Sequence, residues 1–263
     1  MCRHIAYLGP PVSLGRLVLT PPRGLYEQSW SPRRQVNGVV NVDGFGIGWY
    51  PAGSGDGAEP ARYRRAVPIW TDPNVPDLAR AVHSHAVLAA VRSATPGTSQ
   101  DETAAAPFRD GRFLFSHNGV IPGWIDLPAD LAPTTAPITP AELLSLEARN
   151  DSALLWLLIY RELRRGVAPD EALATVVAHV ADVRPTARLN LLLTDGRTIV
   201  ATRYGDTLWY RTGPGSVLVA SEPDDEEPES WNEVPDRTLL LATEAGVVRT
   251  TSLHAAHAAA AEK

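Results

Sequence analysis

Cysteine, methionine and long hydrophobic runs are all scarce in this sequence, which has one Cys and one Met among its 263 residues. A lone cysteine cannot form an internal disulfide, which fits a reducing compartment. The longest apolar run, Ala153–Tyr160, is far shorter than the roughly 20 residues that span a bilayer. The N-terminus lacks a basic region followed by an apolar stretch, so we expect no signal peptide. These absences predict a cytoplasmic protein that does not interact with a membrane.

An excess of positive charge is also missing. The chain has 24 Lys and Arg against 30 Asp and Glu, a net charge of −6. A surface that tracks phosphates needs the opposite balance, so we expect no nucleic-acid partner. The 44% hydrophobic content supplies a large core and excludes an intrinsically disordered chain. We therefore expect a single domain over residues 2–253, followed by an alanine-rich tail over 254–263 that is either a fraying helix or disordered.

Two long helices can be read from the hydrophobic periodicity. Asn150 or Asp151 caps a helix that ends at Arg165, before Gly166, and a second helix covers residues 170–183. Short β-branched or aromatic runs predict strands at 5–8, 44–50, 113–116, 189–194, 198–204, 217–220 and 238–242.

The connections between these elements carry turn signals. Asp195-Gly196 separates two of the predicted strands, as in a hairpin. Residues 51–60, 128–140 and 222–229 are expected to be surface loops. The acidic run 224–227 within the last could attract a cationic substrate, but a solvated loop is the favoured interpretation. Many strands with a clustered helix pair indicate an α+β layered domain.

The single cysteine stands at position 2, directly after Met1. Removal of Met1 would leave a thiol and a free α-amine on one residue. The reference pKa of an α-amine is about 7.7–8.0, so it can take the thiol proton near neutral pH. Cys2 then combines a nucleophile with its own base. The alternatives are a small residue in a frayed terminus and, less favoured, a lipidated cysteine.

A second candidate is the segment Ser116-His117-Asn118-Gly119 at the end of a predicted strand. The Asn118 side-chain amide and the Gly119 backbone N–H can point to one place, where they would bind the oxyanion of a tetrahedral intermediate. The alternative is an Asn-Gly turn that closes a hairpin.

Two further segments carry groups suited to an amino-acid substrate. Arg92 can pair with a carboxylate through two hydrogen bonds, and Thr95 adds a hydroxyl donor. Asp151, at the start of the first long helix, can accept from an ammonium group. The alternative roles are an arginine that extends to solvent from a strand end and a simple helix cap.

Together these segments follow a recognisable order: an N-terminal Cys, then Arg-x-Ala-Thr, then His-Asn-Gly, then Asp-Ser before a helix. In this order the sequence resembles the class II glutamine amidotransferases, which are N-terminal-nucleophile hydrolases. The resemblance covers nearly the whole chain and implies a four-layer αββα sandwich. It also implies that Cys2 is the nucleophile and that Asn118 and Gly119 form the oxyanion hole. Arg92, Thr95 and Asp151 would then hold the α-carboxylate and α-amine of a γ-glutamyl group.

The chain departs from the usual family pattern beside the arginine. Ala90 stands where a histidine is common, and Ser93 stands where an aromatic residue is common. In members that pass ammonia to a synthase, the aromatic residue helps to close the pocket toward the ammonia channel. A serine leaves more room for a bulky leaving group, and the chain has no length left for a synthase domain. We therefore expect amide hydrolysis without an obligate synthase partner.

The N-terminal third is more specific. Residues 1–9, 28–33 and 40–50 resemble the amidohydrolases of ergothioneine biosynthesis. The resemblance implies hydrolysis of γ-glutamyl-hercynylcysteine S-oxide, with release of glutamate. The trimethylammonium group of this substrate suits an aromatic cage, for which Trp30 and Trp49 are candidates. The alternative is core packing, which is the more common role of a tryptophan.

Other functions stay open at this point. The enzyme could hydrolyse glutathione-like γ-glutamyl peptides, or it could be a free-standing glutaminase that supplies a synthase. It could also be a binding module without catalysis. His83 and His85 would share one face of a strand and could bind a metal, but no third ligand accompanies them. We expect neither a metal nor another cofactor.

Overall fold

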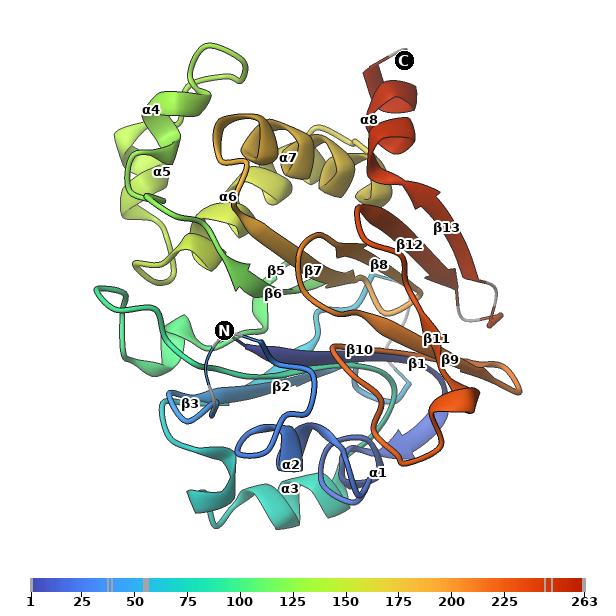
Figure 1. The fold of residues 1–263 in the computed structure, drawn as a ribbon. Helices are drawn as coiled ribbons and strands as arrows, with labels where there is room; N and C mark the ends of the chain where they lie inside the picture. Colours follow the sequence, from blue (N-terminus) through green and yellow to red (C-terminus); the bar gives the residue numbers. More distant parts are fainter. Residues whose placement is uncertain are drawn as a thin grey trace.

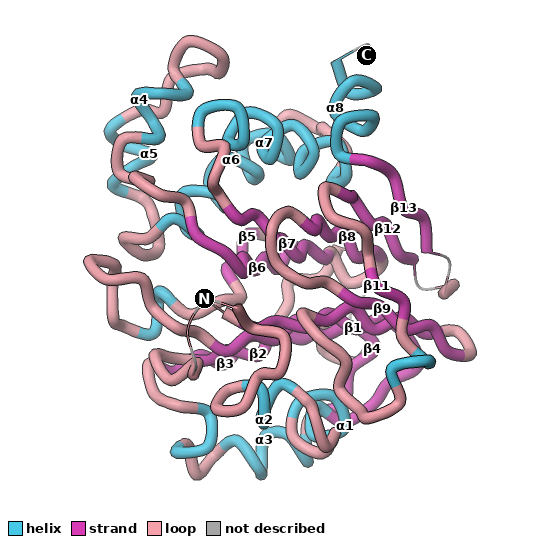
Figure 2. The backbone as a smooth tube through the Cα atoms, in the orientation of Figure 1, coloured by secondary structure: helices cyan, strands magenta, loops and turns pink. Residues whose placement is uncertain are grey.

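The computed structural model describes residues 2–36, 38, 40–53, 57–243, 245–246 and 248–261. Within these residues the chain forms two antiparallel β-sheets that lie one above the other, with helices on both outer faces (Figures 1 and 2). The first, sheet A, contains in spatial order β11 (Asn232–Glu233), β9 (Trp209–Gly213), β10 (Ser216–Ala220), β1 (Arg3–Ser13), β4 (His83–Val91), β2 (Phe45–Trp49) and β3 (Ala61–Arg65).

The second sheet, sheet B, faces the first. Its strands in spatial order are β13 (Val248–Ser252), β12 (Thr238–Thr243), β8 (Thr198–Arg203), β7 (Arg188–Thr194), β6 (Phe113–Val120) and β5 (Phe108–Asp110). The predicted Asp195-Gly196 hairpin joins β7 to β8, with Gly196 at a φ of 88°.

The helices occupy two outer layers (Figure 1). Below sheet A lie α1 (Leu14–Val18), α2 (Leu25–Gln28), α3 (Val75–Ala81) and the 3₁₀ turn η1 (Ile69–Thr71). Sheet B is covered mainly by α6 (Asp151–Arg164) and α7 (Pro169–Val183), with α4 (Leu127–Leu131), α5 (Pro140–Leu144) and α8 (Leu253–Ala261) beside them. Two short turns, η2 (Glu102–Ala104) and η3 (Pro228–Ser230), lie in connecting segments. No described helix is long and apolar enough to cross a membrane.

The alternation of side chains along β1 explains the layers. Ile5 and Tyr7 pack with the helices below sheet A, whereas Ala6 and Leu8 pack against sheet B. Because both faces of the central strands are buried, these strands are apolar throughout. The αββα sandwich that the resemblance implied is confirmed.

Both predicted long helices are confirmed. The side chain of Asn150 caps α6 by accepting from the N–H of Ala153 at 2.8 Å, and Gly166 follows the helix with a φ of 84°. Three expectations about irregular segments were wrong or incomplete. The strand predicted at 113–116 continues to Val120, so Asn118 and Gly119 pair with β7 and do not form a turn.

The other two corrections concern the loops. The segment 128–140 contains most of α4. In 222–229, Glu222 and Asp224 are buried, whereas Glu226, Glu227 and Glu229 are exposed, so only part of this acidic run is a solvated loop. Part of the predicted loop 51–60 lies outside the described residues. Of the two expectations for the tail, the helix is confirmed: α8 packs on α7 through Leu253 and Ala256 in the sheet-B helical layer.

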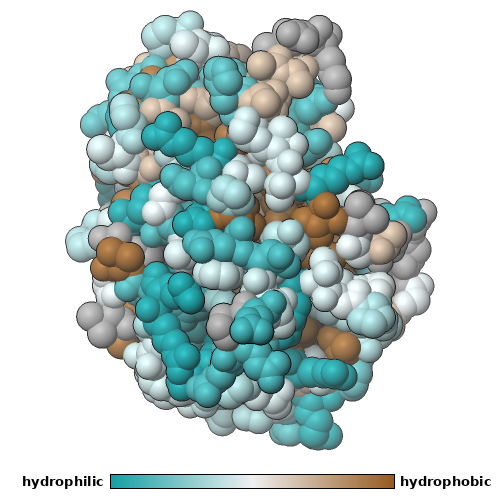
Figure 3. All heavy atoms as spheres, turned by 45° about the vertical axis from the view of Figure 1, so that its right-hand side comes forward, coloured by the Kyte–Doolittle hydropathy of each residue, from teal (hydrophilic) through white to brown (hydrophobic). Residues whose placement is uncertain are grey.

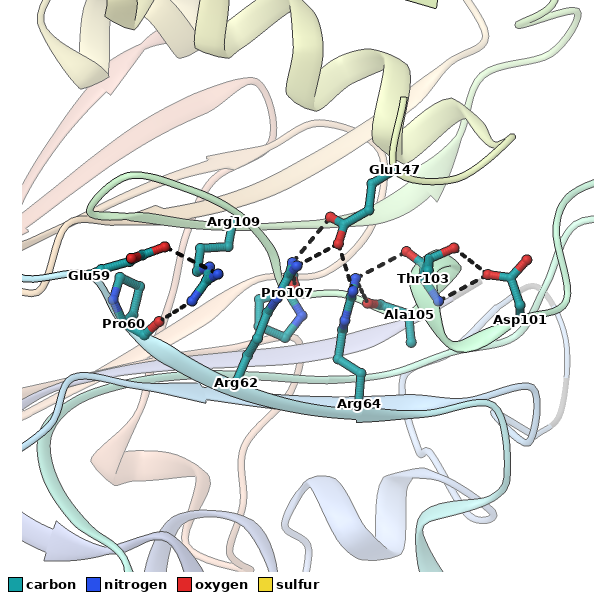
Figure 4. A network of polar contacts seen from close by, with 10 residues as sticks. All are labelled: Glu59, Pro60, Arg62, Arg64, Asp101, Thr103, Ala105, Pro107, Arg109 and Glu147. Carbon is teal, nitrogen blue, oxygen red and sulfur yellow. Dashed lines mark hydrogen bonds and ion pairs between the residues drawn. The ribbon is translucent and has the colours of Figure 1, made fainter. Parts of the chain in front are cut away.

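A polar network closes the flank where the edge strands β3 and β5 lie (Figure 4). Glu147, just before α6, accepts from Arg62 at 2.5 and 3.1 Å and from Arg64 at 2.6 Å, both on β3. On β5, Arg109 donates to the Pro60 carbonyl at 2.9 Å. The network therefore ties sheet A to the layer above sheet B. The face brought forward in Figure 3 is mostly hydrophilic, and its apolar residues gather at mid-height.

Candidate active site

The candidate nucleophile lies where the two sheets meet at one end of the sandwich. Cys2 directly precedes β1, the central strand of sheet A, and is partly exposed. Its backbone nitrogen donates to Oδ1 of Asn118, on β6 of sheet B, at 3.1 Å. The fold therefore brings together two residues that are 116 positions apart in the chain.

The Asn118 amide is fully buried, and this hydrogen bond fixes its orientation. Because Oδ1 accepts from Cys2, Nδ2 must point the other way. Nδ2 is buried and has no hydrogen-bond partner among the described residues. A buried amide nitrogen without a partner costs folding free energy, and such a group is common where a ligand supplies the acceptor. The amide thus offers two N–H bonds beside Cys2.

Gly119 follows in the same strand and leaves no space for a side chain. An added Cβ would lie 1.9 Å from the Arg188 carbonyl oxygen on β7. The preceding His117 is buried and bridges two elements: Nε2 lies 2.9 Å from that carbonyl and Nδ1 lies 3.0 Å from the Ser152 hydroxyl. A carbonyl only accepts, so Nε2 carries a proton and donates to it. His117 therefore fixes β6 against α6, which explains a residue whose role the sequence left open.

Arg92 extends β4 beside the start of β1, because Val91 pairs with Arg3. Its side chain is buried, and NH2 donates to the Thr98 hydroxyl at 3.1 Å and the Ser99 carbonyl at 2.7 Å. NH1 is buried and has no partner among the described residues. The guanidinium is therefore positioned by one nitrogen and offers the other to a ligand.

The segment after Arg92 is fixed by the preceding β2 region. The Asp43 carboxylate accepts from the Ala94 N–H at 2.7 Å, and the Asp43 N–H donates to the Arg92 carbonyl at 2.9 Å. Thr95 comes next and is half-buried; its carbonyl accepts from the Thr98 hydroxyl at 2.7 Å. Asp43 thus determines where Thr95 lies, a role that the sequence analysis missed.

Asp151 is the first residue of α6 and is buried. One carboxylate oxygen accepts from the Ile121 N–H at 3.0 Å, directly after β6, and the other accepts from the Ser152 N–H at 2.9 Å. Asn150 caps the helix, so Asp151 is not the capping residue. Its carboxylate lies near the end of β6 and has further lone pairs with which to accept from an ammonium group.

Two buried residues next to Cys2 were not identified from the sequence. His4 is fully buried, with Nδ1 at 3.1 Å from the Ser116 hydroxyl. Burial, together with the charges of His117 and Arg3, lowers the pKa of His4 to about 3. Arg3 is also fully buried, and burial lowers its pKa while Glu222 and Asp206 raise it. Arg3 shares the face of Ile5 and His4 shares the face of Ala6, so both are buried because both faces of this strand are covered.

The two candidate tryptophans have aromatic and apolar packing partners in the structure. Trp30 packs edge-to-face between Tyr26 and Trp70, at ring distances of 5.0 and 5.4 Å, in the layer below sheet A. Trp49 packs against the core below that sheet. Phe45, on β2, pairs with Val91 at the Cys2 end of the sheet. Trp49 is four residues further along β2, which places it about 13 Å from Phe45 along the strand.

The two histidines considered for a metal lie at the start of β4, the end opposite Val91. His83 is exposed, and His85 packs near Tyr50 at a ring distance of 6.2 Å. Between them, Ser84 donates to the Tyr50 carbonyl at 2.8 Å. The part of the chain that the structure describes contains no group of three or more His, Cys, Asp or Glu residues that could hold a metal ion.

The site thus gathers a thiol, an unpartnered amide donor, an unpartnered guanidinium nitrogen and a carboxylate at one end of two facing sheets. This fold and arrangement define an N-terminal-nucleophile amidotransferase domain. The chain belongs to the class II glutamine amidotransferases, since residues 25–214 match the family described by that name.

Curated relatives extend the match to nearly the full chain. The chain is 42% identical over 250 residues to the γ-glutamyl-hercynylcysteine sulfoxide hydrolase of Mycolicibacterium smegmatis, a match that covers 95% of this chain and 99% of the relative. Against the enzyme of the same name from Mycobacterium tuberculosis the identity is 41%, covering 95% and 96%. A probable glutamine amidotransferase of Saccharomyces cerevisiae is 26% identical, covering 91% and 81%.

Solved structures show the same architecture. A glutamine aminotransferase class-II domain protein from Silicibacter pomeroyi superposes with a TM-score of 0.66 at 26% identity, covering 96% of this chain and 99% of that one. The glutamine phosphoribosylpyrophosphate amidotransferase of B. subtilis has a TM-score of 0.62 at 15% identity, covering 96% of this chain and 49% of that one, and supports the fold alone.

Proposed function

We propose that this protein hydrolyses the γ-glutamyl amide bond of γ-glutamyl-hercynylcysteine sulfoxide, releasing glutamate and hercynylcysteine sulfoxide. The observation that carries the chemistry is the Asn118 amide, whose oxygen binds the Cys2 nitrogen while its buried Nδ2 has no partner in the described part of the chain. The substrate is proposed from the two mycobacterial relatives of 41–42% identity over 95% of this chain.

In this mechanism Cys2 acts as the N-terminal residue, after removal of Met1, which lies outside the described residues. The α-amine takes the thiol proton, and the thiolate sulfur attacks the γ-carbonyl carbon. The oxygen of the tetrahedral intermediate takes the negative charge and accepts from Asn118 Nδ2 and the Gly119 N–H. These donors stabilise the charge as it develops.

The intermediate then collapses. The carbon–nitrogen bond breaks, and the α-ammonium of Cys2 gives its proton to the departing amine. The product is a γ-glutamyl thioester on Cys2. Water attacks the thioester while the α-amine takes one of its protons, and the sulfur leaves as the thiolate, which takes that proton back. Every proton moves through groups on Cys2, the water or the leaving amine, so no cofactor enters the scheme.

Three residues are proposed to hold the glutamyl moiety. Arg92, through its free NH1, pairs with the α-carboxylate, and the Thr95 hydroxyl adds a donor. Asp151 accepts from the α-ammonium. These groups surround Cys2 from β4 and from the start of α6, so the same γ-carbonyl is presented to the thiol in each substrate molecule. The aromatic cage at Trp30 and Trp49 stays a prediction.

The protein is proposed to work in the cytoplasm as a free-standing hydrolase on a small molecule. Ser93 and Ala90 at the family's aromatic and histidine positions support this proposal, because a serine leaves more room for a bulky leaving group than an aromatic residue does. The two mycobacterial relatives are named as hydrolases.

The test is the intact mass of the purified protein and glutamate release from γ-glutamyl-hercynylcysteine sulfoxide, with glutamine and glutathione assayed in parallel. We expect loss of Met1, glutamate release from the named substrate and slower release from the other two. Retained Met1 with no release from any of them would contradict the mechanism. Release only from glutathione or only from glutamine would keep the mechanism and replace the substrate.

The matched variants are Cys2→Ala and Cys2→Ser. Cys2→Ala should lose turnover while it still binds the substrate, which calorimetry can measure. Cys2→Ser should retain slow turnover, because a hydroxyl is a poorer nucleophile than a thiolate. Normal activity of Cys2→Ala would exclude the proposed nucleophile.

A further inference from the structure

A pocket of about 130 Å³ lies beside the start of β1 and is outside the group of residues used in the mechanism. Its walls come from two segments that are far apart in the chain. One wall carries Arg33 and Arg34, and the other carries Glu222, Pro223, Asp225 and Glu226. The pocket therefore presents both signs of charge within one small space.

Glu222 positions the arginine wall. Its carboxylate is buried and accepts from the backbone N–H of Arg33 at 3.0 Å and of Arg34 at 2.6 Å. Two charge-assisted hydrogen bonds to one carboxylate fix the local backbone, so both side chains leave it in defined directions. Glu222 thus acts as a positioning residue for the two arginines.

The Arg34 guanidinium lies over an aromatic ring. Its Cζ is 4.6 Å from the ring centroid of Trp209, which is buried in sheet A. Stacking uses the face of the guanidinium and leaves its N–H edge available for a carboxylate. Arg33 differs, because its NH2 is 3.2 Å from Glu226, a largely exposed carboxylate that also pairs with Arg23 at 2.8 Å.

The pairing of β1 with the end of β10 places this pocket relative to the nucleophile. The Ser221 N–H donates to the His4 carbonyl at 3.0 Å, and the His4 N–H donates to the Ser221 hydroxyl at 3.0 Å. Glu222 therefore lies across from Arg3, the residue after Cys2. Since neighbouring strands are about 4.8 Å apart, the backbone of Glu222 lies roughly 5–10 Å from that of Cys2, and the Glu222 side chain leaves sheet A on the face of Arg3 and Ile5.

That separation matches the length of the proposed leaving group. In hercynylcysteine sulfoxide the cysteine nitrogen is the scissile one, and the far end is a betaine with a carboxylate and a trimethylammonium group. The cysteine carbons, the sulfoxide and the imidazole ring separate the two ends by roughly 10 Å when extended. A zwitterionic end needs a donor and a carboxylate side by side, and the pocket supplies both.

We propose that this pocket is the distal leaving-group subsite, in which Arg34 binds the carboxylate of a betaine and Glu226 faces its quaternary ammonium. The inference rests on the proposed function and extends it to substrate choice. Glutamine has no group that reaches the pocket, and a glutathione-like leaving group ends in a carboxylate without a cation. The subsite thus favours a long zwitterionic leaving group over both.

The test compares two substrates that differ only in the distal end. One is γ-glutamyl-hercynylcysteine sulfoxide, and the other is its analogue whose imidazole ring lacks the betaine side chain. Glutamate release gives kcat/KM for each. We expect the wild-type protein to prefer the full substrate by at least about tenfold, since one charge-assisted hydrogen bond corresponds to about 10- to 100-fold.

Arg34→Met keeps the stem of the side chain and removes the charge. We expect it to reduce the preference by about tenfold or more, mainly through KM, and to leave the truncated analogue unchanged. Glu226→Gln should reduce the preference by a smaller factor, because its carboxylate is exposed to water. Arg80→Met, on an exposed helix surface, is the matched control and should change neither rate.

The truncated analogue separates the possible failures. If the wild-type protein releases no glutamate from either substrate, the proposed function itself is wrong. If the wild-type protein hydrolyses both equally, or if Arg34→Met keeps the wild-type preference, the subsite is wrong and the chemistry stands. Should Arg34→Met not fold, Arg34→Lys replaces it, because lysine keeps the charge but loses the stacked planar donor edge and should still lower the preference.

Discussion

The buried His4 makes the stability of this protein depend on pH in a way that can be worked out from the structure. His4 is fully buried beside the nucleophile, and its pKa is lowered to about 3 by burial and by His117 and Arg3. In the unfolded chain the same imidazole titrates near 6.5. Between these two values the unfolded state binds one more proton than the folded state, so the free energy of unfolding decreases as the pH falls.

The magnitude follows from the two pKa values. Between pH 7 and pH 4.5 the protonation of the unfolded imidazole should remove about 2.5 kcal/mol of stability, with a limiting slope of about 1.4 kcal/mol per pH unit. Carboxylates add their own pH dependence, so the total slope of the wild-type protein does not isolate His4. The difference between the protein and a variant without the imidazole does.

The variant is His4→Asn, whose Oδ1 can keep the hydrogen bond with Ser116. Free energies of unfolding in urea are measured at pH 7, 6, 5 and 4.5 for both proteins. The wild-type protein should be the more stable one at pH 7, and its advantage should shrink by about 2.5 kcal/mol at pH 4.5. His83→Asn, which alters an exposed histidine of the same sheet, should run parallel to the wild type. Parallel curves for His4→Asn would refute the buried neutral imidazole.

Four further substitutions test the site and its frame. Asn118→Ala should lower kcat by about 100- to 1,000-fold with little change in KM, and a loss under fivefold in steady-state assays would exclude Nδ2 as an oxyanion donor. Gly119→Ala places a carbon against the Arg188 carbonyl oxygen, so thermal melting should show a strongly destabilised protein; an unchanged melting temperature would mean that β6 and β7 separate easily. Arg92→Lys should raise KM about tenfold with kcat within about threefold, since lysine cannot supply both donor edges, and an unaltered KM would remove Arg92 from carboxylate binding. Glu147→Gln should lower the free energy of unfolding in urea by about 1–3 kcal/mol, and no loss would show that the arginines of β3 are adequately solvated.

The sequence was sufficient to predict the elements with strong local signals. The helices α6 and α7 follow from periodicity with Asn150 and Gly166 at the ends of the first, and the β7–β8 hairpin follows from Asp195-Gly196. Local patterns do not determine how the sheets and helices stack into layers. The αββα order was therefore predicted only from the resemblance, which a few spaced motifs carry.

The contacts between distant segments could not be predicted. An Asn-Gly pair usually forms a turn, but here β7 pairs across both residues and extends the strand. The acidic run at 222–229 has the composition of a solvated loop, yet Glu222 is buried because two backbone N–H groups, 188 and 189 positions away, need an acceptor. Trp30 is a different case. It lies in a segment that resembles the family, and its ring contacts Tyr26 and Trp70 in the helical layer below sheet A.

The Glu147 network also affects whether two copies of the protein can associate through their sheet edges. The strand β3 is the edge strand of sheet A, so its outer edge could pair with a strand of another chain. Its sequence is Ala-Arg-Tyr-Arg-Arg. Arg62 and Arg64 hold a carboxylate beside this edge, and Arg109 holds the Pro60 carbonyl just before it. A second strand that approached there would have to desolvate these charges and break their pairs. The ion pairs that join sheet A to the layer above sheet B therefore also disfavour edge-to-edge aggregation through β3.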